Sequence, residues 1–315
     1  MKKTFKRVAK LAGISALLTG AYAGISKLVF NKAFKDTHEF STDELLETFD
    51  ARLKDKFLST YNRNRDWFIN SKVAKASIKS LDGYVLNGEV IENHEAGREY
   101  VILVHGYNVE SHSLLEQAYH FDRMGYNVLI YDQRGFGASK STNTTLGWQE
   151  QFDLIKWIEY LVLRVNEVKI ALYGVSMGAT SILMALGNEL DKHVKVAVSD
   201  SAYAKLKDMV EEEADDLKTF MPFVMPGLKF LTKQELNFNI DDVDVFKLID
   251  KAKLPILIIH SQNDDVINYE YGVDIYNEYP AYKEFYLIDD CKHAYACYEE
   301  GYFDRIGEFF NKFMR

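Results

Sequence analysis

The stretch Gly174-Val175-Ser176-Met177-Gly178 decides the fold. It directly follows a strand-length apolar run, Lys169–Tyr173, and directly precedes a helix-like segment, Ala179–Glu189. A serine on a tight turn between a strand and a helix has strained backbone geometry, and glycines two positions before and after it are needed where the neighbouring chain crowds the turn. The pattern G-x-S-x-G is weak evidence in any other context. Here it favours Ser176 as a nucleophile over a plain turn with an exposed serine.

Strand-length apolar runs alternate with helix-length segments on both sides of this turn. Two runs, Ala74–Ser80 and Tyr84–Ile91, are joined by Asp82-Gly83, a pair suited to a hairpin. The later runs are Tyr100–Val104, Asn127–Tyr131, Lys169–Tyr173, Val194–Ser199, Pro255–His260 and Glu284–Ile288. This alternation predicts an α/β fold with a mostly parallel central sheet flanked by helices.

One connection is far longer than the others. About fifty residues separate the strand that ends at Ser199 from the strand that starts at Leu254, whereas such loops usually span about 2–6 residues. The sequence therefore predicts a small helical cap, inserted at about residues 203–250.

A serine hydroxyl becomes a good nucleophile only when a base removes its proton. In a fold of this type the chain order is serine, acid, histidine. Of the eight histidines, His293 alone follows an acid that comes after the late strands begin, and it lies in a loop just past the run Glu284–Ile288. We therefore predict that His293 is the base.

The acid must hold the imidazole in one tautomer and stabilise the imidazolium that forms. Asp264 and Asp265 both follow the run Pro255–His260 in a short loop, where such a carboxylate belongs. We favour Asp264. Asp265 stays open as an alternative, and so does Asp200 at the end of the preceding strand.

A tetrahedral oxyanion needs two preorganised donors, which are usually backbone N–H groups. Met177 is one candidate, because it follows the nucleophile and opens a helix. Tyr107 is the other, after His105-Gly106 at the end of the run Tyr100–Val104. His105 itself is expected to shape that turn.

Taken together, these segments resemble the α/β-hydrolase superfamily, in particular its serine-aminopeptidase-like and bacterial esterase-like branch. Val104-His105-Gly106-Tyr107 resembles the strand end that forms the oxyanion site. Asp132–Ser139 matches the structural turn D-x-R-G-x-G-x-S. Ile259–Asp265 is similar to the H-G-x-x-D segment, with Ser261 where glycine is usual, and this similarity places the acid on Asp264.

The resemblance implies an α/β-hydrolase fold from about Ala74 to the carboxyl end. It also implies cleavage of carboxylic esters through an acyl-enzyme, with peptide or amide cleavage as the main alternative and a non-catalytic binding module as a remote one. Within the cap, Phe220–Leu228 is unusually apolar. We expect part of it, with Met221 and Met225, to line an acyl pocket; the alternative is that it only packs the cap onto the sheet.

Composition excludes other classes of partner. The net charge is −9 and the 38 Lys and Arg residues form no basic stripe after the first ten positions, so we expect no nucleic-acid partner. We expect no cofactor and no metal, because no such motif occurs. Cys291 and Cys297 are expected to be free thiols, with a local bridge as the alternative. The expected partner is a small-molecule acyl ester or a peptide substrate.

The amino terminus differs from the rest of the chain. A cationic stretch, Lys2–Lys10, precedes an uncharged run from Leu11 to Ser26. Residues 1–30 are therefore predicted to be a signal peptide, with Ala21-Tyr22-Ala23 as a cleavage site, or a membrane anchor; an ordinary cytosolic helix is the third reading. In the first two readings the chain is exported. It is then either attached to the membrane through residues 1–30, with the catalytic domain outside, or secreted, and we favour these locations over the cytoplasm. Residues 31–72 are predicted to be a helical lead-in, and residues 73–315 the hydrolase domain.

Overall fold

The structure is a computed structural model, which describes residues 20, 22–95, 97–140, 142–213 and 219–314. Its centre is an eight-stranded sheet in the order β1-β2-β4-β3-β5-β6-β7-β8. The strands are β1 (Val73–Lys79), β2 (Val85–Ile91), β3 (Glu99–Val104), β4 (Asn127–Tyr131), β5 (Lys169–Val175), β6 (Val194–Asp200), β7 (Ile256–Ser261) and β8 (Lys283–Ile288). The pairs β1–β2 and β2–β4 are antiparallel and the other five are parallel. The predicted hairpin and mostly parallel sheet are confirmed.

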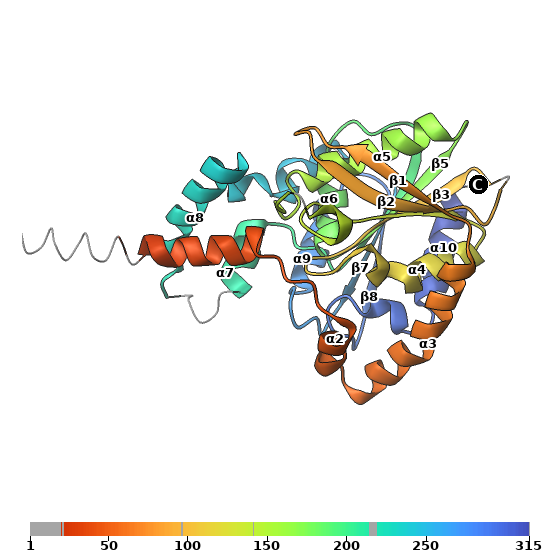
Figure 1. Cartoon of the computed structure of the whole chain (residues 1–315), viewed down its shortest axis with the longest axis horizontal. Coiled ribbons are helices and arrows are strands. Elements are labelled where there is room, and N and C mark those ends of the chain that lie inside the picture. The colour runs from red at the N-terminus through yellow and green to blue at the C-terminus, as the bar shows by residue number, and fades with distance from the viewer. Residues whose placement is uncertain (1–19, 21, 96, 141, 214–218, 315) are drawn as a thin grey trace, which may run out of the picture.

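Helices cover both faces of this sheet (Figure 1). The helices are α2 (Thr42–Thr48), α3 (Ala51–Asn70), α4 (Leu115–Arg123), α5 (Glu150–Arg164), α6 (Met177–Leu186), α7 (Leu206–Glu213), α8 (Met221–Leu236), α9 (Glu270–Glu278) and α10 (Tyr302–Phe313). Helices α5, α6 and α9 bury apolar side chains against one face, and α4 and α10 against the other, with α3 packed on α4.

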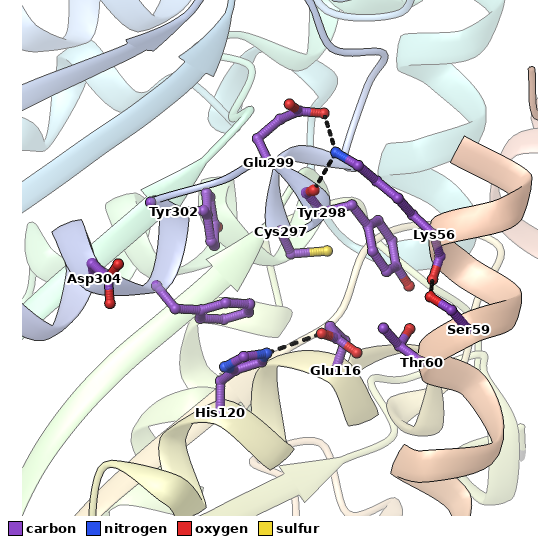
Figure 2. A pocket seen from close by; sticks show the side chains of 12 residues that line it. Lys56, Ser59, Thr60, Glu116, His120, Cys297, Tyr298, Glu299, Tyr302 and Asp304 are labelled. Carbon is purple, nitrogen blue, oxygen red and sulfur yellow. Dashed lines mark hydrogen bonds and ion pairs between the residues drawn. The ribbon is translucent and has the colours of Figure 1, made fainter. Parts of the chain in front are cut away.

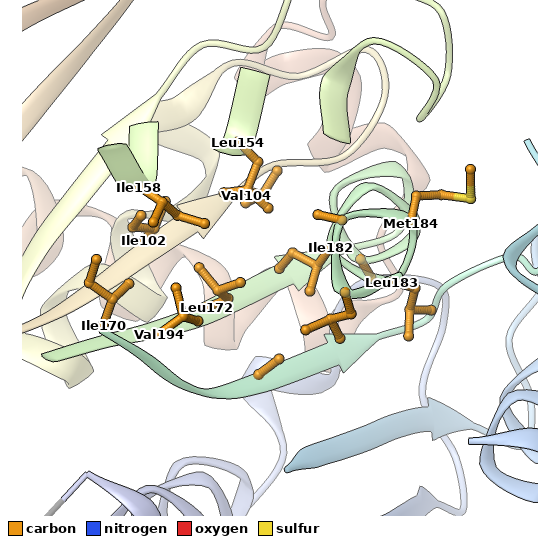
Figure 3. Close-up of a cluster of buried hydrophobic side chains, with 14 of the residues drawn as sticks. Ile102, Val104, Leu154, Ile158, Ile170, Leu172, Ile182, Leu183, Met184 and Val194 are labelled. Carbon is orange, nitrogen blue, oxygen red and sulfur yellow. The ribbon is translucent and has the colours of Figure 1, made fainter. Parts of the chain in front are cut away.

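The core between β3, β5 and the helices α5 and α6 is built from the strand side chains that point to one face of the sheet. Alternate residues of a strand point to the same face, and Figure 3 shows such residues meeting the helices. They are Ile102, Val104, Ile170 and Leu172 from the strands, against Leu154, Ile158, Ile182 and Leu183 from the helices. Each such side chain contributes roughly 1.5–3 kcal/mol on full burial, so this packing stabilises the strands from which the functional loops leave.

The cap predicted between β6 and β7 consists mainly of α7 and α8. Its buried face gathers Met221, Val224, Met225 and Leu228 of α8 with Leu206 and Val210 of α7. The cap is therefore helical, as expected, and the apolar stretch near Pro222 and Pro226 forms the first half of α8.

A helix at residues 22–30 lies along this cap (Figure 1). Ser26 Oγ donates to the Val224 carbonyl at 3.0 Å, and a Cβ on Gly227 would lie only 2.3 Å from Ser26 Oγ. Phe30 is fully buried in the same cluster. This part of the chain therefore belongs to the packing of the cap, which its sequence did not indicate.

The predicted lead-in at residues 31–72 is broken into three helical pieces. A π-helical turn spans Asn31–Lys35 and precedes α2 and α3. Ser41 and Glu44 form a capping box at the start of α2, and the Asp50 side chain accepts from the Leu53 N–H at the start of α3. These caps start new helices, so the periodicity does not continue as one helix.

Most of the predicted export or anchor segment, residues 1–19 and 21, lies outside the described residues. Among the described helices, none is long and apolar enough to cross a membrane. Cys291 and Cys297 are both buried and free.

Candidate active site

Ser176 occupies the strained turn that its sequence context predicts. Its backbone has φ 55° and ψ −120°, a conformation that a residue with a side chain adopts only when the surroundings enforce it. A Cβ on Gly174 would lie 2.6 Å from the Gly178 carbonyl, and a Cβ on Gly178 would lie 2.1 Å from the Val104 carbonyl oxygen. Glycines are therefore required at both positions because backbone crowds them.

His293 lies beside this serine. Its Nε2 is 2.8 Å from Ser176 Oγ, and its Nδ1 is 2.8 Å from Asp264 Oδ2. An ionised carboxylate only accepts hydrogen bonds, so Nδ1 carries the ring proton and Nε2 is left to accept from the serine hydroxyl. The structure thus brings Ser176, His293 and Asp264 together in one hydrogen-bonded chain from the ends of β5, β8 and β7.

The surroundings of Asp264 keep it ionised. Burial of the carboxyl raises its pKa, but the nearby His260 ring and hydrogen bonds from His293 and the Ile267 N–H outweigh burial and lower the pKa below the ordinary value of 3.8. Its Oδ1 accepts from the Val266 and Ile267 backbone N–H groups at 3.0 and 2.7 Å. Backbone donors thus fix the carboxylate in position.

The two alternative acids do not reach the ring. Asp265 is half exposed, and its Oδ1 accepts from the backbone N–H of His293 at 3.2 Å. Asp200 is buried, and its carboxyl accepts from the Tyr302 and Ser201 hydroxyls at 2.6 and 2.9 Å. Asp264 is therefore the carboxylate that contacts the imidazole.

The loop after β3 runs against the serine. A Cβ on Gly106 would lie 3.4 Å from Ser176 Cβ, which puts the adjoining Tyr107 peptide next to Ser176. Met177 is the first residue of α6, and N–H groups in the first turn of a helix have no partner within that helix. Of the two residues predicted as oxyanion donors, Met177 is next to Ser176 in the chain and Tyr107 is next to it in space.

His105 shapes this loop, as expected from the sequence. Its ring is buried, and its Nε2 accepts from the Gln133 N–H at 2.8 Å while Nδ1 donates to the Gly106 carbonyl at 2.7 Å. Burial lowers the pKa of His105. The neutral ring joins the loop after β3 to the loop after β4.

The turn Asp132–Ser139 is held by its acidic first residue. Asp132 accepts from the Ser111 and Ala138 backbone N–H groups, both at 2.8 Å. Gly137 has φ 50°, and a Cβ there would lie 2.3 Å from the Asp132 carboxylate. Arg134 is buried and pairs with Asp153 at 2.7 Å. The turn is thus a rigid structural support beside the site.

His260 contacts the acid, which its sequence position did not reveal. The ring is fully buried. Its Nε2 lies 3.0 Å from the Ile267 carbonyl oxygen and 3.5 Å from Asp264 Oδ2. Donation from Nε2 to that carbonyl ties the acid loop to β7. The motif that contains His260 is the signal that could have indicated this role.

The apolar stretch of the cap divides between two faces of α8. Met221 and Met225 are buried in the cluster that also contains Met177, the residue after Ser176. Phe223 points outward instead, 58% exposed and stacked on Tyr22 with ring centroids 4.9 Å apart. An acyl pocket could therefore draw on the buried methionines but not on Phe223.

A separate cavity of about 300 Å³ lies between α3, α4 and the start of α10 (Figure 2). Figure 2 shows two pairs among its lining side chains, Lys56 with Glu299 and His120 with Glu116. None of Ser176, His293 and Asp264 lines this cavity. It is a gap between helices and is separate from the candidate active site.

Comparison with known proteins finds similar hydrolases and esterases. Residues 95–251 match the family model described as serine aminopeptidase, S33. The uncharacterized protein YqkD of Bacillus subtilis (strain 168) is 28% identical over 220 residues, which are 69% of this chain and 72% of that protein.

Solved structures share the architecture. The Pyrococcus furiosus esterase Pf2001 aligns with a TM-score of 0.64 and 23% identity, over 79% of this chain and 95% of that chain. The acylaminoacyl peptidase of Pyrococcus horikoshii aligns with a TM-score of 0.57 and 17% identity, over 79% of this chain and 43% of that chain. The sheet order and these matches agree: the chain has the α/β-hydrolase fold and is a hydrolase, and its residues 95–251 are similar to the serine aminopeptidase family.

Proposed function

We propose that the chain hydrolyses carboxylic esters through an acyl-enzyme, with Ser176 as nucleophile, His293 as base and Asp264 as acid. The observation that carries this proposal is the unbroken chain of two 2.8 Å hydrogen bonds from Ser176 Oγ through the His293 ring to Asp264. Such a chain activates a serine that is otherwise a poor nucleophile.

The reaction follows from these contacts. As Ser176 Oγ bonds to the acyl carbon, His293 Nε2 takes the hydroxyl proton, and the carbonyl oxygen becomes an oxyanion. The N–H groups of Tyr107 and Met177 are the proposed donors to that oxyanion. Collapse breaks the bond to the leaving alcohol, which receives the proton from Nε2. Water then attacks the acyl-enzyme by the same route and releases the acid and free Ser176.

Peptide or amide cleavage is the second candidate. The matched family model is described as serine aminopeptidase, and the same residues can transfer a proton to a leaving amine. Hydrolysis of an acyl-chain series of chromogenic esters beside a panel of aminoacyl amides separates the two. We expect the esters to be cleaved faster; preferential cleavage of the amides would overturn the ester assignment.

A binding module without catalysis is the remote alternative. Only an activated serine reacts quickly with a fluorophosphonate probe. We expect rapid labelling at Ser176, and its absence in folded protein would favour the module.

We also propose that the chain associates with the cell membrane through its amino terminus, with the catalytic domain outside. The cationic stretch Lys2–Lys10 and the uncharged run that follows support export. Packing of Tyr22 on Phe223 supports an uncleaved segment. On α8, Phe223 and Phe230 are 58% and 63% exposed, as suits a surface facing the lipid interface. Intact chain recovered wholly in the soluble cytoplasmic fraction would contradict this; secretion of a cleaved chain is the alternative outcome.

A further inference from the structure

A strap formed by residues 32–40 crosses the two loops that border the candidate oxyanion site. It connects the helix at residues 22–30 to α2. Side-chain hydrogen bonds join it to partners 74 to 98 positions away along the chain. The contacts fall on Tyr107, the residue after it, and the glycines of the turn after β4.

Tyr107 is fixed first by its hydroxyl. This group donates to the Lys32 and Ala33 carbonyls, each at 3.1 Å. Carbonyls at the end of a helix lack partners within it, and the tyrosine hydroxyl supplies one. The side chain of the proposed oxyanion residue is therefore tied to the strap.

The glycines on either side of Phe136 are held by the same strap. Thr37 Oγ1 donates to the Gly135 carbonyl at 2.9 Å, and the Gly137 N–H donates to Glu39 Oε1 at 2.6 Å. Phe136 is fully buried, and its ring meets the Tyr107 ring edge-on with centroids 5.6 Å apart. The strap thus also fixes the ring on which Tyr107 packs.

The residue after Tyr107 is fixed as well. The Phe40 N–H donates to the Asn108 carbonyl at 2.9 Å, and Asn108 has φ 59°. With His105 held from the other side, the Tyr107 peptide has little freedom to rotate. That peptide carries the N–H assigned to the oxyanion.

We propose that the strap is a positioning element of the oxyanion site, so that Thr37, Glu39 and the Tyr107 hydroxyl set the direction of the Tyr107 N–H. This rests on the proposed function. An oxyanion donor stabilises the transition state only when it lies about 2.7–3.1 Å from the oxygen. The amino-terminal segment therefore completes the hydrolase domain as well as leading into it.

The test uses full-length Tyr107→Phe and Thr37→Val, which each remove a hydroxyl and leave the Tyr107 N–H in the chain. Tyr279→Phe is the matched control, because the Tyr279 hydroxyl also donates to a backbone carbonyl, that of Leu254, at 2.7 Å. Leu254 lies before the amino end of β7, whereas Asp264 follows the carboxyl end of that strand. For each protein kcat, KM, Tm and the affinity for a phenylboronic acid are measured; this acid forms a tetrahedral adduct on an active serine.

We expect Tyr107→Phe and Thr37→Val to lower kcat by about 10- to 100-fold with KM unchanged. Boronate affinity should fall by a similar factor, while Tyr279→Phe keeps both values. The positioning role would be overturned if Tyr107→Phe kept the wild-type kcat, or if it lowered the Tm but kept the wild-type boronate affinity. Wild-type protein that neither cleaves esters or amides nor binds the boronate would instead refute the proposed function.

Discussion

Gly178 lies so close to Val104 that a Cβ added to it would sit 2.1 Å from the Val104 carbonyl oxygen. The added Cβ would be fixed to the Gly178 backbone and the oxygen belongs to the Val104 backbone, so no side-chain rotation can relieve the contact. We expect Gly178→Ala to destabilise the fold by about 1–3 kcal/mol or more and to displace the Ser176 turn, with loss of most activity.

Gly307→Ala is the matched control for that substitution. Gly307 also lies in a helix, α10, where the nearest atom to an added Cβ is the flexible Met124 Cε at 3.5 Å. Here alanine should leave activity unchanged and stabilise the helix by about 0.5–1 kcal/mol. Equal Tm values and activities for the two variants would contradict the packing at Gly178.

The two neighbouring aspartates should respond very differently to removal of charge. Asp264→Asn should lower kcat/KM by about 10⁴, as expected when a triad acid no longer fixes the tautomer. Asp265→Asn should cost little, because its side chain is half exposed and contacts the His293 backbone N–H and Lys292 instead of the imidazole. Steady-state kinetics on one ester measures both. The reverse order would move the acid by one residue.

Glu116 should make the stability of the protein sensitive to acid. Burial raises its pKa, but hydrogen bonds from His120, Asn64 and Arg63 outweigh burial and lower the pKa to about 2. A carboxylate with a lowered pKa stabilises the fold fully above its ordinary value of 4.5, and this contribution is lost as pH falls toward about 2. The loss amounts to at most about 3 kcal/mol.

Urea unfolding at several pH values checks this. In wild type the free energy of unfolding should fall as pH drops below about 5, and the fall should be smaller in Glu116→Gln. Glu278→Gln, at an exposed position of α9, should keep the wild-type slope. An undiminished slope in Glu116→Gln would show that other carboxyls cause the acid sensitivity.

The amino-terminal helix should contribute to stability through its buried side. Phe30 is fully buried in the cap cluster, so Phe30→Ala should cost about 3–5 kcal/mol. Leu28 is 70% exposed in the same helix, and Leu28→Ala should change stability by no more than about 0.5 kcal/mol. Thermal unfolding of the two variants decides it; similar small effects would mean that the helix is not docked in solution.

The sheet and most of the site could be predicted because their signals are local. The glycines around Ser176 are adjacent to it in sequence, and the alternating apolar runs reflect strand burial. The loops that carry His293 and Asp264 each follow a recognisable strand. Resemblance favoured Asp264 over Asp265, and the geometry agrees, because only Asp264 reaches Nδ1 of the imidazole.

The strap and the amino-terminal helix could not be predicted, because their contacts join distant parts of the chain. Thr37 and Gly135 are 98 positions apart, and no pattern around Thr37 indicates a partner. Residues 22–30 belong to the segment 1–30 whose pattern suggests export, yet the burial of Ser26 and Phe30 depends on the shape of α8. Periodicity likewise could not tell which face of α8, with Phe223 or Met225, is buried.

Activation of Ser176 by His293 is measured by the rate of fluorophosphonate labelling, with the modified residue located by mass spectrometry. Wild type should be labelled rapidly and only at Ser176. Ser176→Ala should not be labelled, and His293→Gln should be labelled far more slowly while its circular dichroism stays that of wild type. Labelling of folded His293→Gln at the wild-type rate, or modification of wild type at another residue, would contradict the account.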